Sequence, residues 1–154
     1  MKKKVCVVSL IFFLIDLVSK IIILSFENKL PLTVINNFFT LDKVGNTGAA
    51  FSIFSGYTFL LILIAVFVLV YLWKYIICDI SSRLGFISFS MLIGGIIGNL
   101  FDRIIYGEVI DFLSFNIFGY GFPIFNLADT FICVGVFLLI IDFVRGEKSE
   151  NSSK

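Results

Sequence analysis

The chain has 154 residues, of which 59% are hydrophobic and 15% are charged, and its mean hydropathy is +1.07. An ordinary soluble domain is about half apolar and about one quarter charged, so this composition excludes a soluble globule. The formal net charge is +1 and histidine is absent, which argues against nucleic acid as a partner and against His-based catalysis. We expect a small membrane protein that uses no metal and no cofactor.

Four apolar stretches are each long enough to cross about 30 Å of hydrocarbon as a helix. They are residues 5–26, 57–77, 84–105 and 124–144. We interpret them as transmembrane helices of one domain, residues 1–145, followed by a disordered cytoplasmic tail, residues 146–154. The first stretch is read as a retained span rather than a cleaved signal peptide, because no Ala-x-Ala-like site follows and the apolar run continues past Lys20.

Basic residues predict the orientation, because Lys and Arg near the ends of spans stay on the cytoplasmic side. Most lie at the N-terminus, in the second loop or in the tail: Lys2, Lys3, Lys4, Lys74, Arg83, Arg145, Lys148 and Lys154. Both termini are therefore expected in the cytoplasm. Cys78 would then lie in a reducing compartment and Cys6 and Cys133 within spans, so we expect no disulfide.

The two loops predicted to face outward differ in character. In loop 27–54, residues 33–35 and 38–41 have strand-like composition, which predicts a small sheet on the outer membrane surface. Loop 106–123 is short, rich in Phe and Gly, and carries the acids Glu108 and Asp111 but no base.

Ionisable residues inside apolar stretches are the informative ones, because their burial must be offset by a partner or a function. Asp16 and Lys20 lie four residues apart in the first span, so they share a helix face and can pair. The pair either neutralises itself and pins the bundle or anchors a site above it. We favour the anchor, since both groups fall in the outer half of the helix.

The third span ends in a run of small and polar residues. Gly94 and Gly98 form a small-xxx-small face that lets a neighbouring helix come close. Asn99, Asp102 and Arg103 are spaced by three and four residues, so a polar cluster continues from that face toward the outer surface.

Two carboxylates reach the same depth: Asp111 in the outer loop and Asp129, one turn inside the fourth span. Neighbouring carboxylates cannot both ionise cheaply, so one would hold a proton while the other takes a proton from water. This indicates an acid–base hydrolase. The alternative is structural, because Asn126 and Asp129 also resemble helix N-terminal capping residues.

Five segments resemble, in the same order, motifs of the bacterial lipoprotein signal peptidases (signal peptidase II). They are Asp16-Leu17-Val18-Ser19-Lys20, Asn46-Thr47-Gly48-Ala49-Ala50-Phe51-Ser52, Gly94-Gly95-x-x-Gly98-Asn99-Leu100-x-Asp102-Arg103, Gly107-x-Val109-x-Asp111-Phe112 and Phe125-Asn126-Leu127-Ala128-Asp129. The last three motifs together are specific, whereas the first is weak by itself.

The resemblance implies an all-α polytopic membrane protein, with four transmembrane helices and a small extracytoplasmic β-sheet cradle. It implies an intramembrane aspartyl endopeptidase that cleaves prolipoproteins before the diacylglyceryl-modified cysteine, with Asp111 and Asp129 as the catalytic dyad. Residues implied to bind substrate or support the site are Asn46, Gly48, Asn99, Arg103, Asn126, Ala128, Asp16 and Lys20.

By the same resemblance the protein is expected in the bacterial cytoplasmic membrane, as a monomer in contact with lipids, with its site near the outer face. The signal peptide of the substrate would enter from the bilayer as a helix, which suits the face of Gly94 and Gly98.

Two other classes remain open. A proton-coupled transporter would also keep acids in its spans, but it needs a path across the bilayer, and the cytoplasmic halves of the last three spans are almost free of ionisable groups. A non-enzymatic scaffold does not explain why polar groups gather at one depth.

Overall fold

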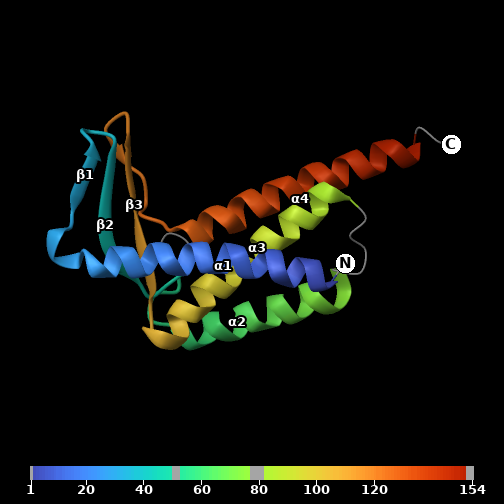
Figure 1. Cartoon of the computed structure of the whole chain (residues 1–154), viewed down its shortest axis with the longest axis horizontal. Coiled ribbons are helices and arrows are strands. Elements are labelled where there is room, and N and C mark those ends of the chain that lie inside the picture. The colour runs from blue at the N-terminus through green and yellow to red at the C-terminus, as the bar shows by residue number, and fades with distance from the viewer. Residues whose placement is uncertain (1, 50–52, 77–81, 152–154) are drawn as a thin grey trace.

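The structure is a computed structural model that describes residues 2–49, 53–76 and 82–151. Within these ranges the chain forms a bundle of four α-helices with an antiparallel sheet at one end (Figure 1). The helices are α1 (Lys2–Ser25), α2 (Thr58–Tyr71), α3 (Arg83–Ile105) and α4 (Leu127–Asn151). The start of α1 and the end of α4 both lie at the end of the bundle away from the sheet.

Three helical segments in the described part of the chain are long and apolar enough to cross a membrane: Lys2–Ser25, Arg83–Ile105 and Leu127–Arg145. The predicted span 57–77 corresponds to the shorter apolar helix Thr58–Lys74, in which α2 continues as a turn of π-helix, η3 (Leu72–Ile76). Helix α4 begins later than predicted, because Phe125 forms a β-bridge with Leu113.

The exterior of the bundle is apolar, and its interior holds polar side chains beside a hydrophobic cluster, as α1 illustrates. Ser9, Asp16 and Lys20 are buried, whereas the exposed side of the helix carries Val7, Leu10, Ile11, Leu14, Ile15, Val18, Ile21 and Ile22. This is the reverse of a surface helix in a soluble protein and suits contact with lipid. Cys6 and Cys133 are free thiols on this exterior, and Cys78 lies outside the described residues.

Helix α3 is central and packs against each of the other three helices. Glycines allow the close approach: a Cβ atom at Gly94 would lie 2.6 Å from Cβ of Phe12 on α1, and one at Gly95 would lie 2.5 Å from the carbonyl oxygen of Ala128 on α4. The face of Gly94 and Gly98 is therefore filled by α1, so the expectation that an incoming signal peptide packs there is wrong.

The sheet has the strand order β1-β2-β3-β4, with β1 (Leu32–Ile35), β2 (Phe39–Asn46), β3 (Val109–Ile117) and β4 (Tyr120–Gly121). The predicted strands of loop 27–54 correspond to β1 and the start of β2. The second outer loop supplies β3 and β4, which we did not predict. Residues 113–117 do alternate between apolar and polar, a period-two signal that the Phe and Gly content of the loop obscured.

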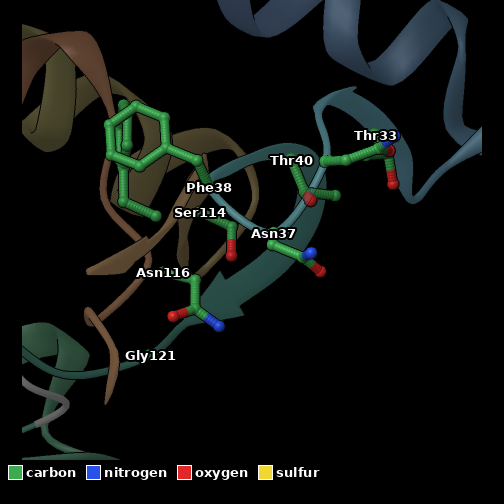
Figure 2. Close-up of a pocket in the computed structure, with 9 residues that line it drawn as sticks. Thr33, Asn37, Phe38, Thr40, Ser114, Asn116 and Gly121 are labelled. Atoms are coloured by element: carbon green, nitrogen blue, oxygen red, sulfur yellow. The ribbon is translucent and has the colours of Figure 1, made fainter. Parts of the chain in front are cut away.

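One face of the sheet is polar. Thr33, Thr40 and Ser114 are paired across three neighbouring strands, and Figure 2 shows these side chains around a hollow that Asn37 and Asn116 also line. The hollow has a volume of about 520 Å³ and contains none of the predicted site residues.

Helix α4 runs to Asn151, so its backbone is helical over 146–151, where we expected the start of a disordered tail. The sequence after Gly146 contains no proline and is rich in Glu and Lys, which are good helix formers. The helix therefore continues beyond the apolar segment. Residues 152–154 lie outside the described residues.

Candidate active site

Asp111 is presented near the start of β3, between the buried side chains of Ile110 and Phe112. Its own side chain is buried, and both carboxylate oxygens accept hydrogen bonds from amides. Nδ2 of Asn126 donates to Oδ1 at 2.7 Å, and Nδ2 of Asn46 donates to Oδ2 at 3.0 Å. Asn46 reaches this position because the end of β2 pairs with the start of β3, with Val44 opposite Asp111.

Asp129 lies in the first turn of α4. Its Oδ1 accepts a hydrogen bond from Nδ2 of Asn99 at 2.7 Å, and its Oδ2 accepts one from the backbone N–H of Asn126 at 3.3 Å. Oδ1 of Asn126 in turn accepts from the backbone N–H of Asp129 at 2.8 Å. The capping interpretation of these two residues is thus correct, and the same asparagine also holds Asp111.

Asn99 has one amide orientation in this network. Its Oδ1 accepts from Nζ of Lys20 at 3.3 Å and from Nδ2 of Asn126 at 3.1 Å. Two donors therefore fix which end of the amide is oxygen, and Nδ2 is left to face Asp129. The asparagines 46, 99 and 126 together hold the two carboxylates.

A buried ion cluster lies beneath the asparagines. Nζ of Lys20 is 2.7 Å from Oδ2 of Asp16 and 2.7 Å from Oδ2 of Asp102. Oδ1 of Asp16 also accepts the backbone N–H of Ala128 at 2.8 Å. The predicted pairing of Asp16 with Lys20 is present, and the pair both pins α1 to α4 and supports the residues above it.

Arg103 ties the loop after β2 to α3. Its Nη2 donates to the carbonyl oxygen of Gly48 at 2.7 Å and its Nη1 to the carbonyl oxygen of Asn99 at 3.3 Å. Asn46 shapes the same loop, since its Oδ1 accepts the N–H of Gly48 and its Nδ2 also donates to the carbonyl oxygen of Ala49. Nε of Arg103 is buried with no acceptor among the described residues.

The electrostatics differ between the upper layer of the site, Asp111 and Asp129, and the lower layer, the ion cluster of Asp16, Lys20 and Asp102. Burial raises the pKa of Asp111 from its ordinary 3.8 to about 6; the charge of Asp129 adds to the rise, and the hydrogen bonds from Asn46 and Asn126 and the charge of Lys20 oppose it. In the described part of the chain, neither Asp111 nor Asp129 has a Lys or Arg nitrogen within 4.0 Å, whereas Lys20 pairs with two acids. The upper layer can therefore exchange a proton without breaking an ion pair.

All ten predicted site residues thus meet at the junction of the sheet and the bundle. Sequence reasoning noted Asp102 in the polar cluster but gave it no place in the site, although its position three residues after Asn99 puts both on one helix face. No group of three or more His, Cys, Asp or Glu side chains that could hold a metal ion occurs among the described residues.

The apolar exterior is that of an integral membrane protein, and Asp111 and Asp129, which the same asparagines hold, form its candidate site. Residues 8–145 match the family model described as signal peptidase (SPase) II. The chain belongs to the signal peptidase II family and is a protease.

Individual relatives cover nearly the whole chain. The lipoprotein signal peptidase of Neisseria meningitidis serogroup C, serotype 2a, is 38% identical over 97% of this chain and 93% of its own length. That of Staphylococcus aureus strain JH9 is 38% identical over 79% of this chain and 75% of its own.

Solved structures agree. A bacterial membrane enzyme determined by the in meso method at 2.3 Å resolution is 32% identical, covering 94% of this chain and 90% of that one, with a TM-score of 0.82. A second, determined at 1.9 Å resolution, is 34% identical, covering 90% of this chain and 91% of that one, with a TM-score of 0.77.

Proposed function

We propose that this chain is an intramembrane aspartyl endopeptidase. It removes the signal peptide from diacylglyceryl-modified prolipoproteins by cutting before the lipidated cysteine, with Asp111 and Asp129 activating a water molecule. The relatives named lipoprotein signal peptidase support the substrate class. It acts as a monomer and needs no cofactor.

One observation carries the mechanism: the carboxylates of buried Asp111 and half-buried Asp129 are both held by neutral amide donors. Amide donors fix the position of an acid without neutralising it permanently, as a close ammonium would. The raised pKa of Asp111, about 6, favours this residue as the one that carries the shared proton. Asp129 is then the carboxylate that accepts a proton from water.

The reaction follows from this assignment. Asp129 takes a proton from water as the water oxygen attacks the scissile carbonyl carbon, and Asp111 donates its proton to the carbonyl oxygen. As the carbon–nitrogen bond breaks, the leaving nitrogen takes the proton that Asp129 holds. Collapse of the intermediate returns a proton from its hydroxyl to Asp111, so the dyad is restored.

The membrane geometry we propose has four spans, with the helix Thr58–Lys74 as the second, and both termini in the cytoplasm. The site then lies near the outer face, because β3, which carries Asp111, and the start of α4, which carries Asp129, are at the end of the bundle opposite the termini (Figure 1). A diacylglyceryl anchor keeps the substrate cysteine at that depth. Nε of Arg103, buried with no acceptor among the described residues, is free to donate to a substrate carbonyl.

The test is a gel-shift assay in detergent with a diacylglyceryl-modified prolipoprotein and its unmodified form. Wild-type protein should cleave only the modified form, and Asp111→Asn and Asp129→Asn should each abolish cleavage while the protein stays folded. Near wild-type turnover in either variant would remove the dyad assignment. No cleavage by folded wild-type protein would favour the transporter or the scaffold.

A further inference from the structure

Asp102 is a buried carboxylate that the proposed reaction does not use. It lies in the last turns of α3 with its side chain about 1% exposed. Its Oδ2 is 2.7 Å from Nζ of Lys20 and accepts the backbone N–H of Ile110 at 3.1 Å. Burying a charge at this depth is costly, so these two contacts need a reason beyond filling space.

The hydrogen bond between Asp102 and Ile110 leads to Asp111. Ile110 is the residue immediately before it on β3, so the hydrogen bond from Asp102 fixes the backbone of the strand one residue from the acid. Asp102 thereby joins α3 to the strand at the point where the strand enters the site.

The ion pair between Asp102 and Lys20 leads to Asp129. Asp102 and Asp16 hold Lys20 between them, and Lys20 donates to Oδ1 of Asn99. That bond helps to set the amide orientation in which Nδ2 of Asn99 donates to Asp129. Asp102 is therefore connected to Asp111 through Ile110, and to Asp129 through Lys20 and Asn99.

We infer that Asp102 is a positioning residue that holds Asp111 and Asp129 in register and balances the charge of Lys20 below them. The inference rests on the proposed function, because it assigns Asp102 a part in that reaction. Asp102 touches neither substrate nor the reacting atoms and acts through Ile110, Lys20 and Asn99.

A positioning role predicts more than lost stability. The charged groups around this layer are Lys20 and Asp16 from α1, Asp111 from β3, Arg103 from α3 and Asp129 from α4. In Asp102→Asn the positive charge of Lys20 is balanced only by Asp16, which favours the ionised form of Asp111 and lowers its pKa. Since the reaction needs the proton on Asp111, the alkaline limb of the pH–rate profile should move to lower pH.

The experiment compares wild type, Asp102→Asn and Asp142→Asn in the gel-shift assay across pH, with melting in detergent. Asp142 provides the control, because its carboxylate also joins two elements but lies outside the site: Oδ1 of Asp142 on α4 accepts from the hydroxyl of Ser82, the N-cap of α3, at 2.6 Å. We expect Asp102→Asn to lose at least ten-fold in kcat with KM changed less than two-fold, and the alkaline limb to shift. Asp142→Asn should keep both parameters.

A lower melting temperature with wild-type kcat and an unshifted pH limb in Asp102→Asn would overturn the inference and leave Asp102 structural. If that variant does not fold, Asp102→Glu replaces it: the retained charge should keep the limb in place, while the longer side chain displaces the anchor of Ile110 and lowers kcat. Wild-type kcat in Asp102→Glu would overturn the inference too. Turnover in Asp111→Asn or Asp129→Asn would instead defeat the proposed function.

Discussion

Asn126 and Asp129 cap the first turn of α4 reciprocally: Oδ1 of Asn126 accepts the N–H of Asp129 at 2.8 Å, and Oδ2 of Asp129 accepts the N–H of Asn126 at 3.3 Å. The side-chain amide of Asn126 is then free to donate to Asp111 and Asn99. Asn126 thus both caps helix α4 and links the two acids.

Mutation can separate the capping role of Asn126 from its hydrogen bond to Asp111. Asn126→Ser keeps a capping oxygen, whereas Asn126→Ala loses the cap and should cost about 1 kcal/mol more stability. Both variants lose the side-chain amide whose Nδ2 donates to Asp111 at 2.7 Å, so both should lose cleavage. Melting in detergent and the gel-shift assay report the two effects, and cleavage retained in Asn126→Ser would show that the contact with Asp111 is dispensable.

The hydrogen bond from Asn46 predicts a pH shift. It stabilises the ionised form of Asp111 and so lowers a pKa that burial has raised to about 6. In Asn46→Leu the pKa should rise above that value, and the alkaline limb of the pH–rate profile should move to higher pH, opposite to the shift expected for Asp102→Asn. A limb that stays in place would mean that Asp111 is not the group titrating there.

Stability should depend on pH through the same carboxyl. Its pKa is higher in the folded protein than the ordinary 3.8, so the folded state binds more protons and its stability falls as pH rises from about 4 to about 6. The full difference corresponds to at most about 3 kcal/mol. Asp111→Asn removes this dependence. The melting temperature of the variant should therefore rise relative to that of the wild type as pH increases from 4 to 7. Parallel curves for the two proteins would contradict the raised pKa.

Arg103→Lys should impair turnover more than folding. The guanidinium reaches two carbonyl oxygens, of Gly48 and Asn99, through different nitrogens, and a lysine has one nitrogen for both. The loop after β2 should then lose its fixed position, lowering kcat/KM by about ten- to hundred-fold. The yield of folded protein should match wild type, and turnover equal to wild type would exclude a positioning role for this arginine.

Gly98 should be intolerant of even one methyl group. A Cβ atom there would lie 2.5 Å from Oδ2 of Asp16 and 3.2 Å from Cβ of Ala128. Gly98→Ala should therefore destabilise the protein by about 2 kcal/mol. Gly121→Ala is the control, because a Cβ there meets nothing within 4 Å. Equal melting temperatures for the two variants would show that the bundle relaxes around the added carbon.

Much of the fold was predictable because lipid imposes simple rules. Long apolar runs gave the positions of the four helices, although α4 continues to Asn151, beyond the predicted end at 144. The four-residue spacing of Asp16 and Lys20 gave their ion pair. The pairing of β2 with β3 was not predictable, because a strand alternation of five residues in a loop rich in Phe and Gly is too weak a signal.

For the site, the residue types were readable but the contacts were not. Asn46 and Asp111 are 65 positions apart and meet only because two outer loops form one sheet. Asp102 was placed in the polar cluster but not in the site, because its partners are a backbone N–H and a lysine that already had an acid four residues away. No sequence pattern reveals that a lysine has two acidic partners.

The β-bridge between Leu113 and Phe125 closes the hairpin of β3 and β4 at its base. Asp111 lies just before the bridge in the chain, and Asp129 lies just after it. The N–H groups of Phe112 and Leu113 both donate to the carbonyl oxygen of Phe125, at 3.0 and 2.8 Å. We therefore expect a change of length at the exposed turn around Phe118 to leave the spacing of Asp111 and Asp129 intact. The turn is thus a place for an inserted epitope or fluorophore.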